Sequence, residues 1–90
     1  MKSIAVVILS KEEVERFVSI TSQYDFDIDL RSGRHVVDAK SLGGIMSIDL
    51  NRPLRVEIYS DEYMSLVEEL KDFRTLNKPR ESALNYDDEQ

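Results

Sequence analysis

The segment DAKSLGGIM, residues 38–46, contains the side chain whose type and position best suit phosphate chemistry, the hydroxyl of Ser41. Ser41 stands directly before a short apolar segment, where a serine commonly caps a helix and stabilises it by about 1 kcal/mol. A phosphate on this hydroxyl would be favoured by the helix N-terminus and by the neighbouring Lys40, whereas Asp38 would oppose the added charge. The residues themselves leave open whether Ser41 is only a cap or a regulatory phosphorylation site.

Two other groups of residues invite a chemical interpretation. Asp25, Asp27 and Asp29 alternate with apolar residues in YDFDIDL, but a flat strand does not wrap oxygen ligands around a calcium ion. Gly43 and Gly44 lack the remaining glycines and the Lys-Ser/Thr pair of a phosphate-binding loop, so they either allow close approach of a partner or pack inside the domain. We therefore expect a solvated acidic strand face, and neither a metal nor a cofactor.

The apolar pattern predicts the elements that must position these residues. The expected strands cover residues 3–9, 25–30, 35–39 and 54–59. The expected helices, the first of which begins after the capping box SKEE, cover residues 11–21, 41–48 and 61–73. A turn of hairpin length, RSGR, separates the second and third strands. The order β-α-β-β-α-β-α lacks strict βαβ alternation, which favours an α+β fold with an antiparallel sheet and its helices on one face.

Composition limits the class of protein further. The 90 residues, 41% hydrophobic and 33% charged, suffice for one hydrophobic core. A net charge of −6 argues against direct nucleic-acid binding and favours a basic or mixed-charge protein partner. No apolar run approaches the roughly 20 residues that span a bilayer, and the absence of cysteine is compatible with a cytoplasmic location. The apolar period stops near Leu76, so we expect one domain over residues 1–76 and a disordered or frayed tail over 77–90.

Three stretches between Tyr24 and Phe73 carry a resemblance to a known family: YDFDIDL, VVDAKSLGGIMSIDL and LRVEIYSDEYMSLVEEL. Together with the order of elements over residues 3–74, they resemble the HPr family of the bacterial phosphotransferase system. The best match is AKSLGGIMSI, which is similar to the family's segment Lys-Ser-Ile-x-Gly-x-Met-Ser-Leu. The resemblance implies an open-faced sandwich, in which a four-stranded antiparallel sheet carries three helices on one face.

The resemblance also implies roles for the residues of this segment. Ser41 corresponds to a regulatory serine that a dedicated kinase phosphorylates in Gram-positive bacteria. The residues around that serine contribute to the docking surface for partner proteins. The corresponding candidates here are Lys40, Leu42, Gly43, Ile45 and Met46.

The chain departs from the family where a phosphocarrier histidine is expected. HPr proteins carry phosphate on the histidine of a Gly-x-His-Ala-Arg-Pro loop before the first helix, whereas this chain has ILSKEEVERF, with Ser10 at the histidine position. Glu12 and Glu13 replace the arginine and the proline. A carrier needs a nucleophilic imidazole and groups that hold phosphoryl oxygens, but these glutamates supply negative charge. His35, the only histidine, is expected on the hairpin's returning strand as an ordinary half-exposed residue.

These observations predict a non-catalytic regulatory or adaptor protein. It would bind protein partners through the surface around Ser41, under the control of serine phosphorylation, and the resemblance implies HPr kinase or a transcription regulator as partners. The alternatives are a phosphocarrier with a non-standard acceptor and a purely structural interaction domain. A homodimer through the first strand or the open sheet face is a further hypothesis. It competes with a face covered by long side chains from neighbouring strands. We expect no membrane partner.

Overall fold

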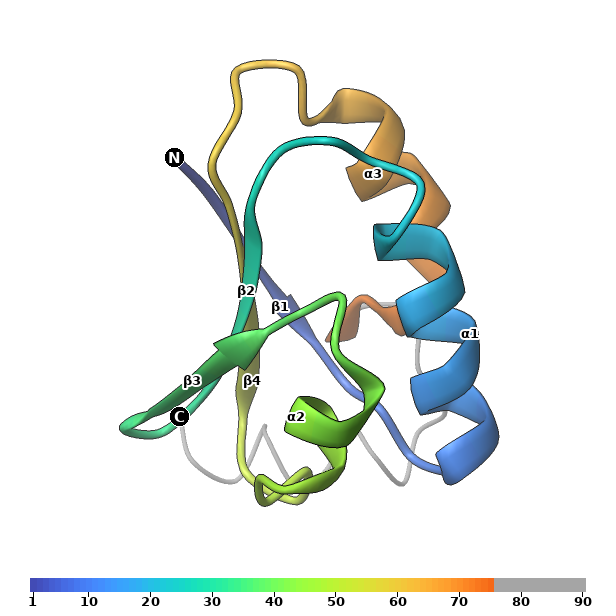
Figure 1. The fold of residues 1–90 in the computed structure, drawn as a ribbon, viewed down its shortest axis with the longest axis vertical. Helices are drawn as coiled ribbons and strands as arrows, with labels where there is room; N and C mark the ends of the chain where they lie inside the picture. The colour runs from blue at the N-terminus through green and yellow to red at the C-terminus, as the bar shows by residue number, and fades with distance from the viewer. Residues whose placement is uncertain (76–90) are drawn as a thin grey trace.

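The computed structural model describes residues 1–75, so the tail expected at 77–90 lies outside the described residues. The strands are β1 (Lys2–Val6), β2 (Ile28–Ser32), β3 (His35–Asp38) and β4 (Leu54–Ile58). The helices are α1 (Lys11–Thr21), α2 (Leu42–Met46) and α3 (Met64–Glu69), and a 3-10 turn follows at Lys71–Phe73. Figure 1 shows this order along the chain, which is the order that the apolar pattern predicts.

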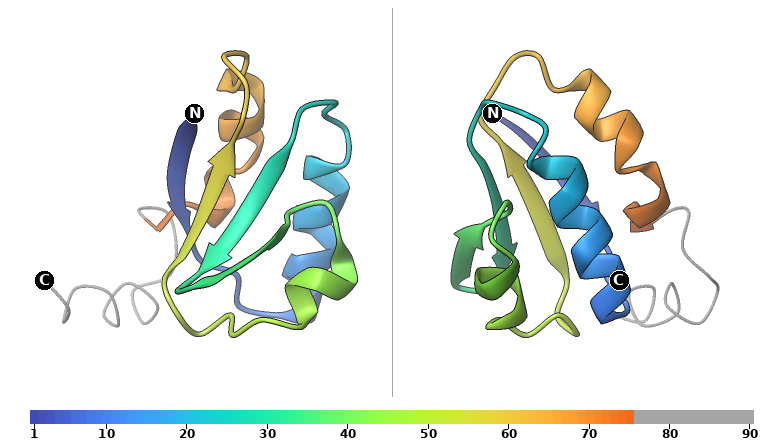
Figure 2. Two further views of the ribbon diagram at one scale, coloured as in Figure 1. Left: turned by 60° about the vertical axis from the view of Figure 1, so that its left-hand side comes forward. Right: turned by 45° about the vertical axis from the view of Figure 1, so that its right-hand side comes forward.

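The four strands form one antiparallel sheet in the order β1-β4-β2-β3, seen side by side in the left view of Figure 2. In the middle of the sheet, Val56 is paired with Ile4 on one side and with Leu30 on the other, and Leu30 is also paired with Val37. Residues paired across strands share a face, so these four form an apolar row. Figure 1 shows all three helices on one side of the sheet. The predicted α+β fold is confirmed.

The hydrophobic core lies where the helices meet this face. Val14, Phe17 and Thr21 of α1 are buried, as the predicted apolar stripe requires. Leu66 of α3 and Phe73 of the 3-10 turn are buried as well. The rings of Phe17 and Phe73 meet edge to face with their centroids 5.6 Å apart. Burying such a side chain contributes about 1.5–3 kcal/mol, so these contacts fix the helices over the sheet.

β1 is shorter than the predicted strand at 3–9. It ends at Val6, where the pairing with β4 stops, and the Val7 N–H donates to the Phe73 carbonyl at 2.8 Å. Val7 and Ile8 are nevertheless buried, at 4% and 3% exposure. The domain itself therefore covers this end of the apolar run.

The other boundaries shift by a few residues. β2 begins at Ile28 and β3 ends at Asp38, whereas the predicted strands begin at 25 and end at 39. α2 is shorter than the predicted helix because Ser41 and Ser47 are its caps. Among residues 1–75, no helix combines the length and the apolar character needed to cross a membrane.

Candidate functional site

Ser41 is the N-cap of α2. Its backbone is extended, with φ −107° and ψ 109°, and its Oγ accepts a hydrogen bond from the Gly44 N–H at 3.0 Å. Asp38 holds the preceding turn: its carbonyl accepts from the Ser41 N–H at 3.0 Å, and its carboxylate accepts from the Lys40 N–H at 2.9 Å. The capping role predicted for Ser41 is therefore present.

The residues after Ser41 divide between the surface and the core. Leu42 and Met46, one helical turn apart on α2, are 40% and 47% exposed, so two large apolar side chains lie at the surface. Ile45 is fully buried in the core. The prediction that Ile45 contacts a partner is wrong, because the helical phase that turns residues 42 and 46 outward turns residue 45 toward the sheet.

The two glycines of α2 have different surroundings. A Cβ on Gly44 would lie 3.1 Å from Ser41 Oγ and 3.4 Å from Val37 Cβ, so glycine permits close packing there. A Cβ on Gly43 would meet nothing within 4 Å. Packing inside the domain therefore explains Gly44, whereas Gly43 leaves open surface beside Leu42.

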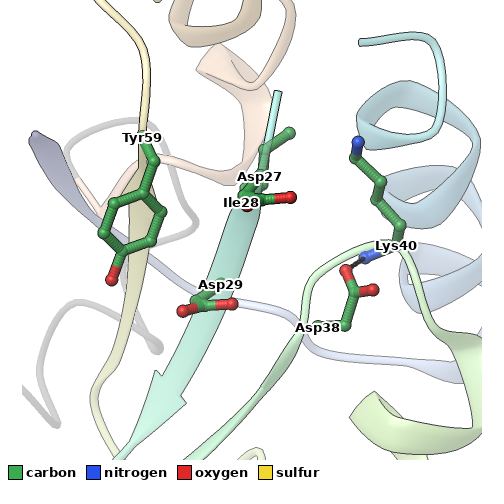
Figure 3. A pocket seen from close by; sticks show the side chains of 6 residues that line it. All are labelled: Asp27, Ile28, Asp29, Asp38, Lys40 and Tyr59. Atoms are coloured by element: carbon green, nitrogen blue, oxygen red, sulfur yellow. Dashed lines mark hydrogen bonds between the residues drawn. The ribbon is translucent and has the colours of Figure 1, made fainter. Parts of the chain in front are cut away.

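The Lys40 side chain is engaged away from the Ser41 hydroxyl. Its Nζ donates to the Tyr24 carbonyl at 2.6 Å, and Figure 3 shows the side chain extending away from α2. The Tyr24 hydroxyl donates in turn to the Glu69 carboxylate on α3. Burial, followed by this hydrogen bond, raises the pKa of Tyr24 to about 12. Lys40 thus ties the turn before α2 to the loop after α1.

The N-terminus of α1 is capped much as SKEE predicts, except that Glu13 reaches back to the residue before the N-cap. Ser10 Oγ accepts from the Glu13 N–H at 3.1 Å, and Glu13 Oε1 accepts from the Leu9 N–H at 2.9 Å. Glu12 is exposed in the same turn, where acidic side chains complement the positive end of the helix dipole. Residues 9–13 contain neither histidine nor arginine, and His35 lies on another element, at the start of β3.

The aspartates of YDFDIDL do not gather around a metal. Asp27 and Asp29 line a cavity of about 360 Å³ together with Asp38 and Tyr59, whereas Asp25 lies outside it (Figure 3). No group of His, Asp or Glu side chains in the described part of the chain could hold a metal ion. Asp29 is directly opposite Asp38 in the pairing of β2 with β3, where like charges repel.

An ion pair crosses the open face of the sheet. Arg31 Nε on β2 lies 2.9 Å from Glu57 Oε2 on β4, and Glu57 is only 8% exposed. The hydrogen bond from Arg31 lowers the pKa of Glu57 below its ordinary value, and the same bond raises the pKa of Arg31. Sequence reasoning missed this pair. Glu57 occupies an outward position of a predicted strand, whereas Arg31 is predicted to lie in the turn RSGR, and only the observed extent of β2 and the strand order bring the two together.

Several solved structures are similar to this one, and three of them are HPr or histidine-containing phosphocarrier proteins. HPr-C-His from Thermoanaerobacter tengcongensis matches with a TM-score of 0.67 and 24% identity, over 80% of this chain and 89% of that one. The phosphocarrier protein HPr from Bacillus anthracis str. Ames matches with a TM-score of 0.65 and 21% identity, over 81% and 95%. The chain has the HPr fold.

A third structure with the HPr fold is a histidine-containing phosphocarrier protein, studied for the divergence of Mycoplasma from Gram-positive bacteria. It matches with a TM-score of 0.66 and 12% identity, over 79% of this chain and 89% of that one. No protein-family profile and no curated protein sequence matches the chain. The HPr fold confirms the architecture that the resemblance implies. At these identities it assigns no role to single residues.

Proposed function

We propose that this chain is a non-catalytic regulatory or adaptor protein that binds protein partners through the surface around Ser41, and that phosphorylation of Ser41 controls this binding. The observation that carries the proposal is the exposure of Leu42 and Met46, two large apolar side chains on the helix that Ser41 caps. Exposed apolar side chains that lie together are typical of protein contacts. Gly43 has open space around it, which leaves room for close approach to the α2 backbone.

A phosphate would change the charge of this surface. Phosphoserine carries about −1.5 to −2 charges at pH 7. The Lys40 ammonium is held at the Tyr24 carbonyl, and Asp38 already places a carboxylate in the preceding turn. The added charge on Ser41 would therefore stay available to arginine or lysine side chains of a partner. Phosphorylation would then favour a basic partner over an apolar one.

The second candidate function is that of a phosphocarrier with a non-standard acceptor. The HPr fold favours it, because the solved neighbours are described as phosphocarriers. The N-terminus of α1 argues against it. Ser10 is engaged in the capping box, and Glu12 and Glu13 would repel a phosphoryl group.

Incubation with HPr kinase and ATP, followed by intact-mass measurement, tests the regulatory proposal. We expect the wild type to gain one phosphoryl group and Ser41→Ala to gain none. Ser47→Ala, which changes the serine at the other end of α2, is the matched control and should retain the gain. No gain in the wild type would reject phosphorylation and favour a purely structural interaction domain. If the kinase phosphorylates the wild type, a pull-down should recover different partners with the unphosphorylated wild type and with Ser41→Asp.

Incubation with enzyme I and phosphoenolpyruvate tests the phosphocarrier function. We expect no acid-labile phosphate on the wild type. A stoichiometric acid-labile signal that persists in Ser41→Ala would reject the non-catalytic proposal. Its loss in His35→Asn would then identify that imidazole as the acceptor, because a phosphate ester on Ser10 would be stable to acid.

A further inference from the structure

A second surface of the domain is basic, although the chain as a whole carries a net charge of −6. It is a cavity of about 460 Å³ between the β2–β3 turn and the chain that follows α2. Arg34 and His35 line it from the turn, and Arg52 and Asp49 line it from the chain after α2. Ser41 is not among its lining residues, so the cavity is separate from the surface of the proposed function.

The walls of this cavity are fixed by the protein itself. Ser32, which is fully buried, donates its hydroxyl hydrogen to the Asp49 carbonyl at 2.7 Å and so joins the turn to the chain after α2. Gly33, with φ +62°, is the first residue of a two-residue turn, a position that favours glycine. Arg52 Nη1 lies 3.2 Å from the position that a Cβ would take on Gly33, so the guanidinium lies directly on the turn.

The protein compensates the positive charges in this cavity only weakly. Arg34 and His35 form no ion pair with any of residues 1–75. Arg52 faces Asp49 at 3.8 Å, but their side chains are 62% and 55% exposed, and such loose surface pairs contribute little. Ser47 satisfies a last-turn carbonyl of α2 with both its N–H and its hydroxyl, which reduces the negative character of that helix end.

We propose that this cavity binds the phosphate group of a small phosphate monoester. The guanidinium groups of Arg34 and Arg52 are forks of N–H donors that match phosphate oxygens, and the His35 imidazole adds a further donor. A phosphate has three terminal oxygens and can meet donors from both walls, whereas a carboxylate offers two oxygens in one plane. The cavity volume of about 460 Å³ lies within the range of about 300–1,000 Å³ that is typical of small-molecule sites.

An NMR titration of the full-length chain with inorganic phosphate and with glycerol phosphate tests this site, at an ionic strength kept constant with sodium chloride. His35 is the only histidine, so its ring resonances report on the cavity without overlap. We expect saturable shifts confined to this ring and to the backbone amides of residues 32–35 and 47–52. Glycerol phosphate should bind at least as tightly as inorganic phosphate, and glycerol should cause no shift.

Charge-removing variants sharpen the test. Arg34→Gln and Arg52→Gln should each weaken phosphate binding about tenfold, the effect of losing one charge-assisted hydrogen bond. Arg55→Gln makes the same change outside the cavity and should leave the affinity within about twofold, because salt screens distant charges.

Three results would overturn the proposal: shifts spread over all basic residues, equal weakening by Arg55→Gln, or tighter binding of a phosphoserine peptide than of glycerol phosphate. If an arginine variant fails to fold, the wild-type titration tests the proposal by itself. Shifts confined to the His35 ring and to residues 32–35 and 47–52 would support the site, and shifts spread over all basic residues would reject it.

Discussion

At the residue scale, a methyl group added to Gly43 would meet different surroundings from one added to Gly44. Gly43→Ala places the methyl in open space and removes the helix penalty of glycine, so we expect the free energy of unfolding to rise by up to about 1 kcal/mol. Gly44→Ala brings the methyl within 3.1 Å of Ser41 Oγ and disturbs the cap, so we expect the free energy to fall. Urea denaturation of both variants measures the difference.

The same pair of variants separates folding from docking. If a partner approaches α2 closely, Gly43→Ala should weaken its binding while the protein becomes more stable. Equal effects of the two substitutions on stability would contradict the packing described for Gly44. Unchanged partner affinity in Gly43→Ala would show that the partner does not use the open space at this position.

At the scale of elements, the local signals predict where helices begin better than where strands meet. The capping box at Ser10 and Glu13 marks the start of α1 because both partners lie within four residues. The cap at Ser41 is predictable for the same reason. The phase of α2 is not predictable in this way, because two glycines leave too few side chains to define an apolar stripe, and the resemblance alone does not reveal that Ile45 is buried.

The remaining differences from the prediction depend on residues far apart in the sequence. The Val7 N–H, just after the end of β1, donates to the Phe73 carbonyl, and no local pattern reveals that partner. The Arg31–Glu57 pair requires β2 and β4 to be neighbours, which the sequence pattern does not specify. The architecture is thus predictable from local signals and from the resemblance, whereas the open face of the sheet is not.

Tyr24 offers a prediction at this scale, because its hydroxyl joins the loop after α1 to Glu69 of α3. Removing this hydrogen bond in Tyr24→Phe should lower the free energy of unfolding by about 1 kcal/mol near pH 8. The folded pKa of Tyr24, about 12, lies above the ordinary 10.0. Its contribution to stability is therefore fully present below pH 10 and is lost as the pH rises toward 12.

Unfolding of the wild type and of Tyr24→Phe at pH 8 and at pH 11 checks this prediction. The difference in free energy between the two proteins should be smaller at pH 11, since the unfolded wild type gains stability there by ionising. A difference that does not change with pH would mean that folding does not raise the pKa of Tyr24. Tyr63→Phe, which changes a partly buried tyrosine at the start of α3, is the matched control.

At the scale of the whole molecule, the two dimer hypotheses differ in the surface that they need. A dimer through the edge of β1 would have to use its N-terminal part, because at the other end Arg74 bridges to Val6 and the Phe73 carbonyl accepts from the Val7 N–H. The open sheet face is covered by long side chains, such as Arg55, whose Nε donates to Ser3 Oγ at 2.8 Å. The charges of this face therefore determine whether a second copy can bind there.

These charges lie in rows across the strands. One row is acidic, because Asp29 is paired with both Glu57 and Asp38. The next row is basic, because Arg31 is paired with Arg55. A second copy related by a two-fold axis perpendicular to the strands would place its basic row over the acidic row of the first. Any association through this face is therefore electrostatic, and the pairing of Arg31 with Glu57 inside each copy makes it weak.

We therefore expect a protein that is mainly monomeric and that associates only at high concentration and low salt. Sedimentation equilibrium at about 0.05 M and about 0.5 M sodium chloride should show the dimer fraction falling as salt screens the rows. Arg55→Glu, which breaks the basic row, should remove the association, whereas Arg16→Glu on α1 should leave it in place. A dimer that persists in high salt would point to an apolar contact instead. A monomer under every condition would eliminate the homodimer.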